Sequence, residues 1–276
     1  MKDRFIDKRV FVTGAGSGLG RALCLALADR GWKTGLADIN EERLRETAEL
    51  VRRRGGQALE VSCDVTRAQD LENAAAIVRG EWGGVDVVIN NAGVSAYGDL
   101  ETIPVERWTW ILNINLLGVI HGCRAFIPVL EKQGGGHIIN IASYLAFLAA
   151  PGSTCYNVTK AGILSLSETL RIELAGKNIG VSVAMPSFFK TNLMDQLYCS
   201  DSGQEKMIRT LFSRSSFPAA KVAEHIIRSM EKNRFYILPQ WDARLLWHIK
   251  RWMPGLYLKM FAFAYRKGYI NRILGV

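Results

Sequence analysis

Cysteine is sparse and scattered in this sequence. Its five cysteines form no C-x-x-C pair, and its four histidines, His121, His137, His225 and His248, form no cluster with metal-ligand spacing. A disulfide framework and a zinc site are therefore not expected, and no metal is predicted. Cysteine usage of this kind is typical of a reducing compartment, so we expect a cytoplasmic protein.

Long apolar runs are also missing. No stretch reaches the roughly 18 uninterrupted apolar residues that suggest a membrane-spanning helix, and the charged first eight residues lack the apolar core of a signal peptide. Neither a spanning helix nor a signal peptide is therefore predicted. Apolar residues make up 49% and charged residues 22% of the 276 residues, which is typical of a globular chain with a large buried core.

Short apolar strands alternate with helical patterns through the first 185 residues. The predicted strands are 9–13, 33–37, 58–62, 85–90, 136–142 and 180–185, and the predicted helices are 18–30, 41–54, 69–82, 106–130 with an interruption at Pro128, and 156–175. Continuous apolar strands separated by helices predict an α/β fold, namely a Rossmann-type, doubly wound parallel sheet in three αβα layers. We assign residues 1–239 to a single catalytic domain and residues 240–276 to a C-terminal helical extension.

A glycine-rich turn over residues 13–20 joins the first predicted strand to the first helix. Gly14 permits the tight turn, Gly18 lets the backbone approach a phosphate, and Gly20 permits close packing of helix and sheet. The free N–H groups at the start of the helix, around Ser17 and Leu19, can bind a pyrophosphate. The turn therefore predicts a dinucleotide cofactor.

Asp38 ends the second predicted strand, 18 residues after Gly20. A carboxylate at this position can accept hydrogen bonds from the adenosine ribose and repels a 2′-phosphate, which favours NAD over NADP. Its alternative interpretation is a helix N-cap. Arg43 lies one turn into the following helix, and the glycine turn carries no arginine before Gly18.

Tyr156 and Lys160 are four residues apart on a predicted helix and so share one face. The Lys160 ammonium is expected to favour the phenolate of Tyr156, because a free phenol has a pKa near ~10 and is a poor base at neutral pH. Ser143 and Asn115 precede this pair. Each of these residues alone has a structural interpretation: a core tyrosine, a serine that caps a strand, and a buried polar asparagine.

Taken together, these residues resemble the classical short-chain dehydrogenase/reductase family. The matching positions are the turn 13–20, Asp64-Val65, Asn90-Asn91-Ala92-Gly93, Asn115, Ser143 and Tyr156-Asn157-Val158-Thr159-Lys160. The resemblance covers residues 8 to about 190. It implies an NAD(P)-dependent oxidoreductase that forms a homodimer or homotetramer.

The resemblance also implies roles for these residues. Asp64 and Val65 contact the adenine, and Asn91, Ala92 and Gly93 shape the floor of the cofactor site. Ser143 holds the substrate oxygen, Tyr156 moves the proton, Lys160 also holds the nicotinamide ribose, and Asn115 fixes a water that links Lys160 to solvent. After the sixth strand the chain has Pro186-Ser187 where the family usually has Pro-Gly, while Thr191 stands where the family often contacts the carboxamide.

Residues 187–217 are rich in bulky apolar side chains and lack a strand pattern. An apolar insertion late in an α/β domain predicts a lid over the substrate pocket. The alternative is a helical pair packed on the core. Together with Leu145, Phe147 and Leu148 just after Ser143, this segment indicates a bulky apolar substrate.

The last 36 residues, 241–276, contain seven Lys/Arg and one acid, Asp242, a net charge of +6 out of +9 for the chain. On a helix, one predicted face is apolar (Leu245, Leu246, Ile249, Trp252, Met253 and Leu256) and the other is polar (Arg244, His248, Lys250 and Arg251). Basic amphipathic helices with tryptophan are typical of peripheral membrane contacts, whereas helices at the ends of soluble proteins usually cover a pocket or a subunit interface. Nucleic-acid binding is not expected, because the basic residues alternate with large aliphatic ones.

The sequence therefore predicts an NAD-dependent oxidoreductase that transfers hydride between nicotinamide and an alcohol or carbonyl of a bulky apolar substrate, such as a steroid-like, terpenoid or long-chain compound. An NADPH-linked ketone reductase and a non-catalytic NAD-binding sensor are the alternatives. Asp38 argues against the first alternative, and the presence of both Tyr156 and Lys160 argues against the second.

Overall fold

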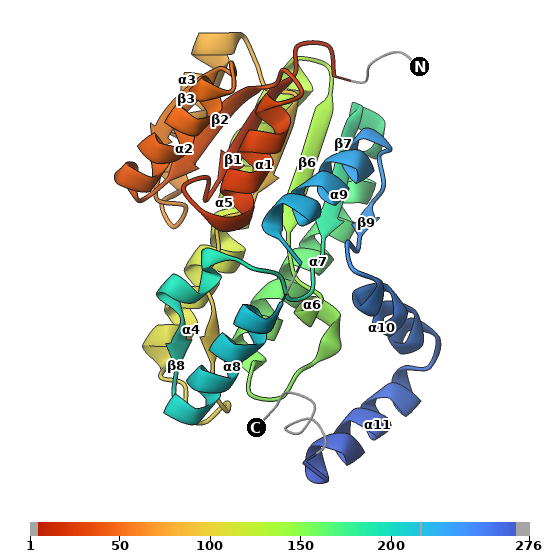
Figure 1. Ribbon diagram of the computed structural model, residues 1–276. Helices are drawn as coiled ribbons and strands as arrows, with labels where there is room; N and C mark the ends of the chain where they lie inside the picture. The colour runs from red at the N-terminus through yellow and green to blue at the C-terminus, as the bar shows by residue number, and fades with distance from the viewer. Residues whose placement is uncertain (1–4, 216, 269–276) are drawn as a thin grey trace.

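Parallel strands form the central sheet of this computed structural model, which describes residues 5–215 and 217–268 (Figure 1). In those residues the sheet has seven strands in the order β3-β2-β1-β4-β6-β7-β9. Their bounds are Arg9–Thr13 (β1), Lys33–Asp38 (β2), Ala58–Ser62 (β3), Val87–Asn90 (β4), Gly136–Ile141 (β6), Ile179–Ala184 (β7) and Tyr236–Ile237 (β9). The strand order reverses between β1 and β4, and in sheets of this type ligands bind outside the carboxyl ends of the strands at such a switch point.

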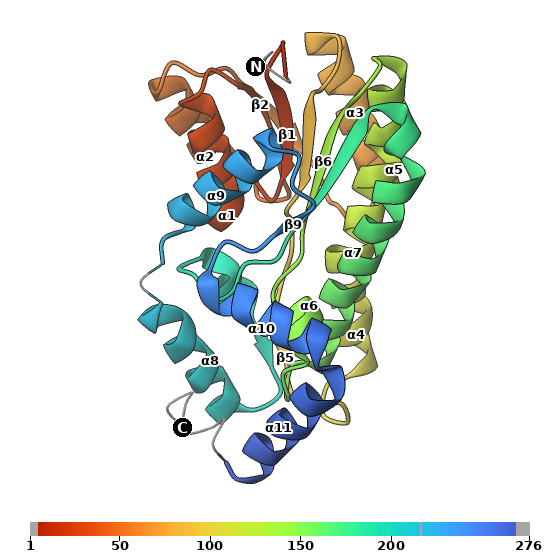
Figure 2. The ribbon, with the colours of Figure 1, turned by 90° about the vertical axis from the view of Figure 1, so that its right-hand side faces the viewer.

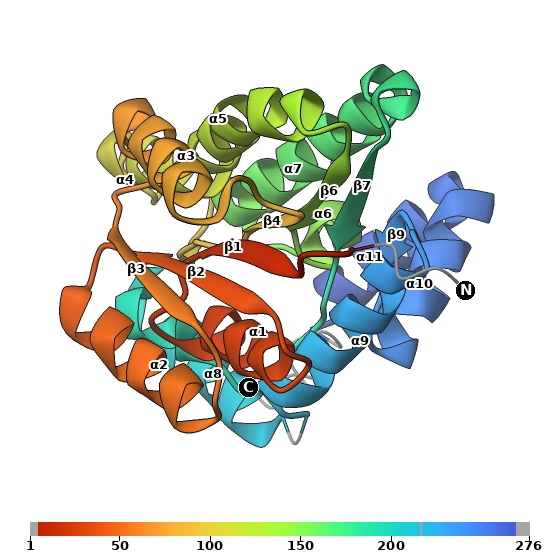
Figure 3. The same cartoon turned by 90° about the horizontal axis from the view of Figure 1, so that it is seen from above.

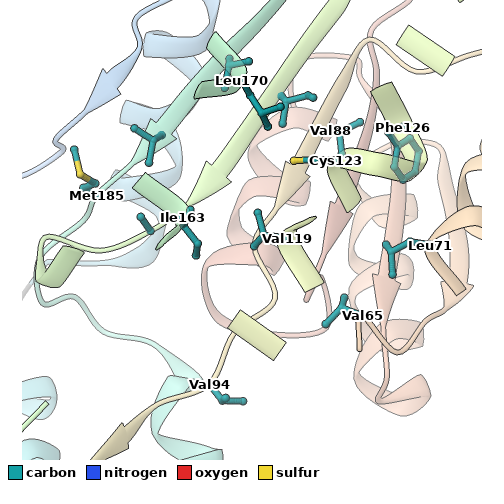
Figure 4. Close-up of a cluster of buried hydrophobic side chains, with 14 of the residues drawn as sticks. Val65, Leu71, Val88, Val94, Val119, Cys123, Phe126, Ile163, Leu170 and Met185 are labelled. Atoms are coloured by element: carbon teal, nitrogen blue, oxygen red, sulfur yellow. The ribbon is translucent and has the colours of Figure 1, made fainter. Parts of the chain in front are cut away.

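Helices cover both faces of this sheet (Figure 3). One face carries α1 (Gly18–Ala28), α2 (Glu41–Arg53) and α9 (Ala219–Glu231), and the other carries α3 (Ala68–Trp82), α4 (Val105–Leu112), α5 (Gly118–Lys132) and α7 (Thr154–Glu173). Buried side chains fill the space between each helical layer and the sheet; Figure 4 shows one such cluster, with Leu71, Val88 and Phe126 among its members. The predicted three-layer αβα fold in a single domain is confirmed.

The break in the long helix before β6 does not lie where the sequence predicted it. Pro128 lies inside α5, and its side chain is exposed. Proline has no N–H to donate to the carbonyl one turn earlier in the helix, but on an exposed face that carbonyl can bind water instead. The interruption is instead a π-helical turn, Asn113–Leu117, between α4 and α5. This turn contains Asn115, and π-turns of this kind often occur at functional sites.

The chain after β7 forms several short elements that the sequence did not predict. They are a 3₁₀ turn at Asn192–Gln196, the strand β8 (Tyr198–Cys199), the helix α8 (Ser202–Arg214), the helix α9 and the edge strand β9. β8 pairs with β5 (Ala96–Tyr97) in a small separate parallel sheet. The predicted lid segment is therefore largely helical, and it is joined to the domain through this small sheet.

The C-terminal extension forms two helices, α10 (Trp241–Trp252) and α11 (Pro254–Arg266), and its residues 269–276 lie outside the described residues. Their inner sides pack on the short helix α6 (Leu145–Leu148) (Figure 2). The Trp247 ring meets Phe147 edge-on at 5.0 Å, and Tyr257 Oη donates to the Leu148 carbonyl at 2.7 Å.

The predicted apolar face of the extension is wrong in part. Leu246 and Ile249 pack on the core, but Leu245 and Trp252 are exposed. The inward face is set by Ala243 and Trp247, the two buried residues of α10. Lys250, which was placed on the polar face, donates to the Phe147 carbonyl. Met253 and Leu256, also assigned to the apolar face, are about half exposed.

By length and composition, one helical run of the described residues, Val105–Lys132, could cross a membrane, although the sequence predicted no such helix. Its buried side chains, such as Ile111 and Phe126, belong to the main hydrophobic core. Figure 3 shows α5 lying on the central sheet beside α3 and α7. The run is accounted for as a core helix.

Candidate active site

A cavity of about 350 Å³ opens at the carboxyl ends of the strands, on both sides of the switch point between β1 and β4. Most of the predicted site residues line it. These are Gly14, Ser17, Gly18, Leu19, Asp38, Asp64, Val65, Asn91, Ala92, Gly93, Ser143, Tyr156, Lys160, Pro186 and Thr191. Gly20 and Asn115 do not reach the cavity surface.

The glycine turn between β1 and α1 needs its glycines for two reasons. Gly14 and Gly18 have φ values of +65° and +51°, which residues with a side chain rarely adopt. A Cβ on Gly18 would lie 2.8 Å from Thr191 Oγ1, and a Cβ on Gly20 would lie 2.0 Å from the Gly14 carbonyl oxygen. Gly20 therefore matches its predicted role in packing and does not contact the cavity.

Ser17 is the N-cap residue of α1, and its side chain accepts no capping hydrogen bond. The first N–H groups of the helix thus have no side-chain partner from Ser17, and a helix N-terminus carries a partial positive charge. Asn91 holds the turn in place, because its Nδ2 donates to the carbonyls of Thr13 at 2.9 Å and Gly14 at 3.2 Å. This geometry suits the pyrophosphate of a dinucleotide.

Asp38 bridges the glycine turn and the start of α2. Its Oδ2 accepts from the Gly16 N–H at 2.8 Å, and its Oδ1 accepts from the Asn40 N–H at 2.9 Å. The alternative interpretation of Asp38 as the helix N-cap is wrong, because the N-cap is Asn40, whose side chain accepts from the Arg43 N–H. Asp38 thus stands at the cavity wall in a fixed orientation.

Arg43 crosses the cavity to the segment after β7. Its guanidinium donates to Asp195 Oδ2 at 2.8 Å, and both residues line the cavity. No local pattern in the sequence predicts that Arg43 pairs with Asp195, because the two residues are 152 positions apart. The ion pair links α2 to the predicted lid segment beside Asp38.

Tyr156 and Ser143 meet at the other end of the cavity. Both are buried, and both line the cavity. The Tyr97 ring stacks on the Tyr156 ring at 6.1 Å. Burial raises the pKa of Tyr156 above its ordinary value, and the neighbouring Ser143 side chain opposes that rise.

Lys160 lies one helical turn after Tyr156 in α7. Its Nζ donates to the Ile141 carbonyl at 3.0 Å and lies 5.6 Å from the centroid of the Tyr156 ring. Burial lowers the pKa of Lys160 to about 8. The expectation that Lys160 lowers the pKa of Tyr156 is not met in this structure, because desolvation disfavours the charged form of both groups.

Asn115 is fully buried behind the cavity wall. Its side chain accepts from the Val94 N–H at 2.8 Å and donates to the Val94 carbonyl at 2.9 Å. These two bonds hold the loop that follows β4 in place. A Cβ on Gly93 would lie 3.2 Å from Asn115 Oδ1 and 3.5 Å from Lys160 Nζ. Asn115 and Lys160 therefore border the same small space beside Gly93.

Apolar side chains form the wall next to Tyr156. Of the three residues after Ser143 that the sequence assigned to the substrate, only Leu145 lines the cavity; Phe147 and Leu148 contact the C-terminal extension instead. The predicted lid contributes Phe188 and Phe212, whose rings meet edge-on at 5.0 Å.

The sequence missed three aromatic residues of this wall: Tyr97, Trp110 and Tyr144. Tyr144 had a signal, because it directly follows Ser143. Tyr97 and Trp110 lie in β5 and α4 and carry no local pattern that marks them. In the described part of the chain, no three His, Cys, Asp or Glu side chains form a group that could hold a metal ion.

A model of the short chain dehydrogenase family matches residues 8–201, a span that begins just before β1 and contains the glycine turn and the Tyr156–Lys160 pair. The chain belongs to this family. The family match covers most of the Rossmann-type domain and stops before α9 and the C-terminal extension.

Known members of the short-chain dehydrogenase family resemble the chain over most of its length. A probable oxidoreductase, EphD, of Mycobacterium tuberculosis is 34% identical over 91% of this chain, but the chain spans only 44% of that protein. A CLA biosynthesis dehydrogenase/reductase of Lactiplantibacillus plantarum is 30% identical over 91% of this chain and 94% of its own length. A crystal structure of a short-chain dehydrogenase/reductase from Burkholderia phymatum in complex with NAD has 31% identity and a TM-score of 0.84, covering 91% of this chain and 96% of that one.

The residues present fit a dinucleotide. The glycines at 14 and 18 leave backbone, not side chains, at the helix N-terminus, and Asp38 stands where a carboxylate can meet a ribose. Lys160 and Tyr156 line the same cavity at the opposite side of the switch point, beyond Gly93. One continuous cavity thus offers a phosphate cradle, a ribose acceptor and a pair of titratable groups.

Proposed function

We propose that this protein is an NAD-dependent oxidoreductase that interconverts an alcohol and a carbonyl on a bulky apolar substrate. One observation carries the proposal: Tyr156 and Ser143 line the same cavity as the glycine turn and Asp38. A proton-transfer group and a dinucleotide cradle in one cavity are what hydride transfer to a carbonyl needs.

When bound, the nicotinamide supplies the hydride acceptor in oxidation and the hydride donor in reduction. In oxidation, the deprotonated Tyr156 removes the proton of the substrate hydroxyl, and Ser143 donates a hydrogen bond to the same oxygen. In reduction, the Tyr156 hydroxyl gives its proton to the oxygen as negative charge develops there. In this proposal the ammonium of Lys160, whose Nζ lies 5.6 Å from the centroid of the Tyr156 ring, offsets part of the cost that burial imposes on the phenolate.

NAD is the proposed cofactor because Asp38 lines the cavity with a fixed carboxylate. Such a group accepts hydrogen bonds from ribose hydroxyls and repels a 2′-phosphate. Arg43, which follows Asp38 by five residues and lines the same cavity, is paired with Asp195. An NADP-linked reaction is therefore the alternative and needs Arg43 to leave that ion pair.

The substrate class follows from the wall beside Tyr156. Leu145, Phe188 and Phe212, together with Tyr97 and Tyr144, surround that part of the cavity with aromatic and aliphatic surface. This lining supports a steroid-like, terpenoid or long-chain alcohol or ketone. The segment 187–217 acts in this proposal as a lid, because its phenylalanines close the apolar side of the cavity.

We also propose a homodimer or homotetramer. Val158 and Ile172, fourteen residues apart on α7, are exposed apolar side chains on one side of that helix. A second copy of the chain can cover them. Light scattering on the purified protein measures the mass and distinguishes these assemblies from a monomer.

The proposal is tested by incubating the purified protein with NAD or NADP and a panel of apolar secondary alcohols while reduced nicotinamide is followed by absorbance. We expect turnover with NAD and bulky apolar alcohols, and little with short polar ones. Turnover only with NADP would favour the ketone reductase alternative. Binding of NAD without turnover of any alcohol or ketone would favour the sensor alternative.

A further inference from the structure

The outer side of α10 carries an apolar stripe that nothing in the described chain covers. Trp241, Leu245 and Trp252 fall on one face of the helix at spacings i, i+4 and i+11. Trp241 is 75% and Trp252 82% exposed, while Ala243 and Trp247 on the inward face are buried. Tryptophan rings rarely stay in water at this level of exposure without a binding role.

The outer side of α11 continues this pattern. Leu256, Met260 and Phe263 fall on one face at i, i+4 and i+7, and each is about half exposed. The inward side of the helix is anchored by Tyr257, which is buried. Trp252 ends α10 and Leu256 lies in the first turn of α11, so the two outer stripes are four residues apart in the sequence.

Basic residues flank both stripes. They are Lys259, Arg266 and Lys267 at the outer side and end of α11, and Arg244 and Arg251 on α10, all of them exposed. The two arginines of α10 also contact the protein: Arg244 donates to the Leu238 and Pro239 carbonyls, and Arg251 lies over the Trp247 ring. The only acid of the extension, Asp242, accepts a hydrogen bond from Ser187 Oγ at 3.2 Å. Among the described residues, no hydrogen bond or ion pair engages the side chains of Lys259, Arg266 or Lys267.

We propose that this extension surface, formed by the six apolar and five basic residues named above, docks on the surface of an anionic lipid bilayer. Tryptophan and large aliphatic side chains insert at the boundary between headgroups and acyl chains, and neighbouring lysines and arginines bind anionic headgroups. The helices lie on the membrane and do not span it, since α10 and α11 are only 12 and 13 residues long.

A second copy of the chain is the rival occupant, and the charge of the surface argues against it. A two-fold contact would bring the same patch of each copy together. Lys259, Arg266 and Lys267 would then face the same cations of the other copy, with Asp242 already engaged by Ser187. Like charges across an interface are repulsive, whereas an anionic membrane complements them.

The position of the surface gives docking a consequence for the cavity. Figures 1 and 2 show α8, α10 and α11 at the same end of the molecule, away from the end where α3 lies. The inner side of the extension contacts α6, which directly follows Ser143. Docking therefore holds the apolar end of the cavity close to the membrane, where apolar substrates partition.

The test is sedimentation of the full-length protein with vesicles of phosphatidylcholine, with and without phosphatidylglycerol. One variant removes apolar groups, Trp252→Ser with Leu256→Ser, and a second reverses charge, Lys259→Glu with Arg266→Glu and Lys267→Glu. The matched controls are Ile6→Ser with Ile77→Ser, and Arg79→Glu with Lys221→Glu and Lys232→Glu, which alter exposed residues on other elements. Each charge variant lowers the net charge from +9 to +3.

We expect the wild type to bind only the vesicles with phosphatidylglycerol, and binding to weaken as salt is raised. Both extension variants should lower the partition coefficient at least ~10-fold. Each basic residue near an anionic surface contributes about 1 kcal/mol, and each methylene removed from water contributes about 0.8 kcal/mol. Both controls should bind like the wild type. Thermal unfolding of each variant checks that the fold is intact.

Three results would overturn the proposal: no wild-type binding to anionic vesicles, equal losses in the extension variants and their controls, or a molecular mass that falls in the Trp252→Ser, Leu256→Ser variant by light scattering. The last result would assign the surface to a second copy. Because vesicle binding is measured without turnover, failure of the proposed oxidoreductase activity would leave this outcome unchanged.

Discussion

The Lys160 ammonium lies 5.6 Å from the centroid of the Tyr156 ring and donates to the Ile141 carbonyl at 3.0 Å. Both side chains are buried, and burial opposes the charge of each. The pKa of Lys160 is lowered to about 8, close to neutral pH. The charge of Lys160, to which the proposed mechanism assigns the support of the Tyr156 phenolate, is thus itself sensitive to pH.

This relationship predicts a pH-dependent stability. Between the pKa of about 8 in the folded protein and the ordinary value of 10.5, the unfolded chain binds a proton at Lys160 that the folded chain does not. The free energy of unfolding contributed by this group therefore rises with pH across that window. In Lys160→Met this contribution is absent, so the wild type should gain stability relative to the variant between about pH 8 and about pH 10.

Chemical denaturation of both proteins at several pH values measures this difference. Lys132→Met, which alters an exposed lysine at the end of α5, is the control and should track the wild type. A gap between wild type and Lys160→Met that stays constant with pH would contradict the lowered pKa. With NAD, Lys160→Met should also show weaker cofactor binding and slower turnover, because one ammonium serves both the phenol and the ribose.

Asp38 should set the choice of cofactor. Replacing Asp38 by Ala removes the proposed ribose acceptor and the repulsion of a 2′-phosphate, so the ratio of kcat/KM for NAD to that for NADP should fall. A hydrogen bond to a charged group contributes about 1.5–3 kcal/mol, which corresponds to roughly 10–100-fold in that ratio. Glu49→Ala is the control, because Glu49 is exposed on α2 and pairs with Arg53 of the same helix. A wild-type preference for NADP would refute the ribose argument.

Tyr257 should anchor the extension to α6. Its hydroxyl donates to the Leu148 carbonyl at 2.7 Å, and the residue is buried. Tyr257→Phe leaves that carbonyl unsatisfied and should lower the free energy of unfolding by about 1–3 kcal/mol. Tyr265→Phe, on the exposed part of the same helix, should change it little. Denaturant midpoints measure both variants, and equal midpoints would show that the hydrogen bond does not hold the extension.

The sequence predicted the main sheet and most cavity residues because their signals are local. The glycine turn has a fixed spacing, Asp38 ends a continuous apolar strand, and Tyr156 and Lys160 are four apart on a helix. Each of these features is read within a window of a few residues. The α9 helix carried such a signal as well, with Val222, Ile226 and Met230 at helical spacing, although it was not predicted.

The rest depended on contacts between distant parts of the chain. The strands β5 and β8 have two residues each, too few for an alternating pattern, and the ion pair of Arg43 with Asp195 joins residues 152 positions apart. The π-turn at Asn115 was not predicted, because Pro128 indicated that the break in the helix lies further along the chain. Pro128 is exposed, and the helix continues through it. In the extension, the buried face of α10 contains Trp247 and not the whole apolar face that the sequence predicted. Trp247 packs inward because its ring meets Phe147 of α6.

The proton transfer assigned to Tyr156 is the centre of this account. The measurement that tests it most directly is turnover of NAD by Tyr156→Phe, with NAD affinity determined in parallel. Phenylalanine removes the transferable proton and little volume, so kcat should fall at least ~100-fold while the dissociation constant for NAD stays close to that of the wild type. Retention of more than a few per cent of wild-type kcat with full NAD binding would contradict the assignment of Tyr156 as the acid and base.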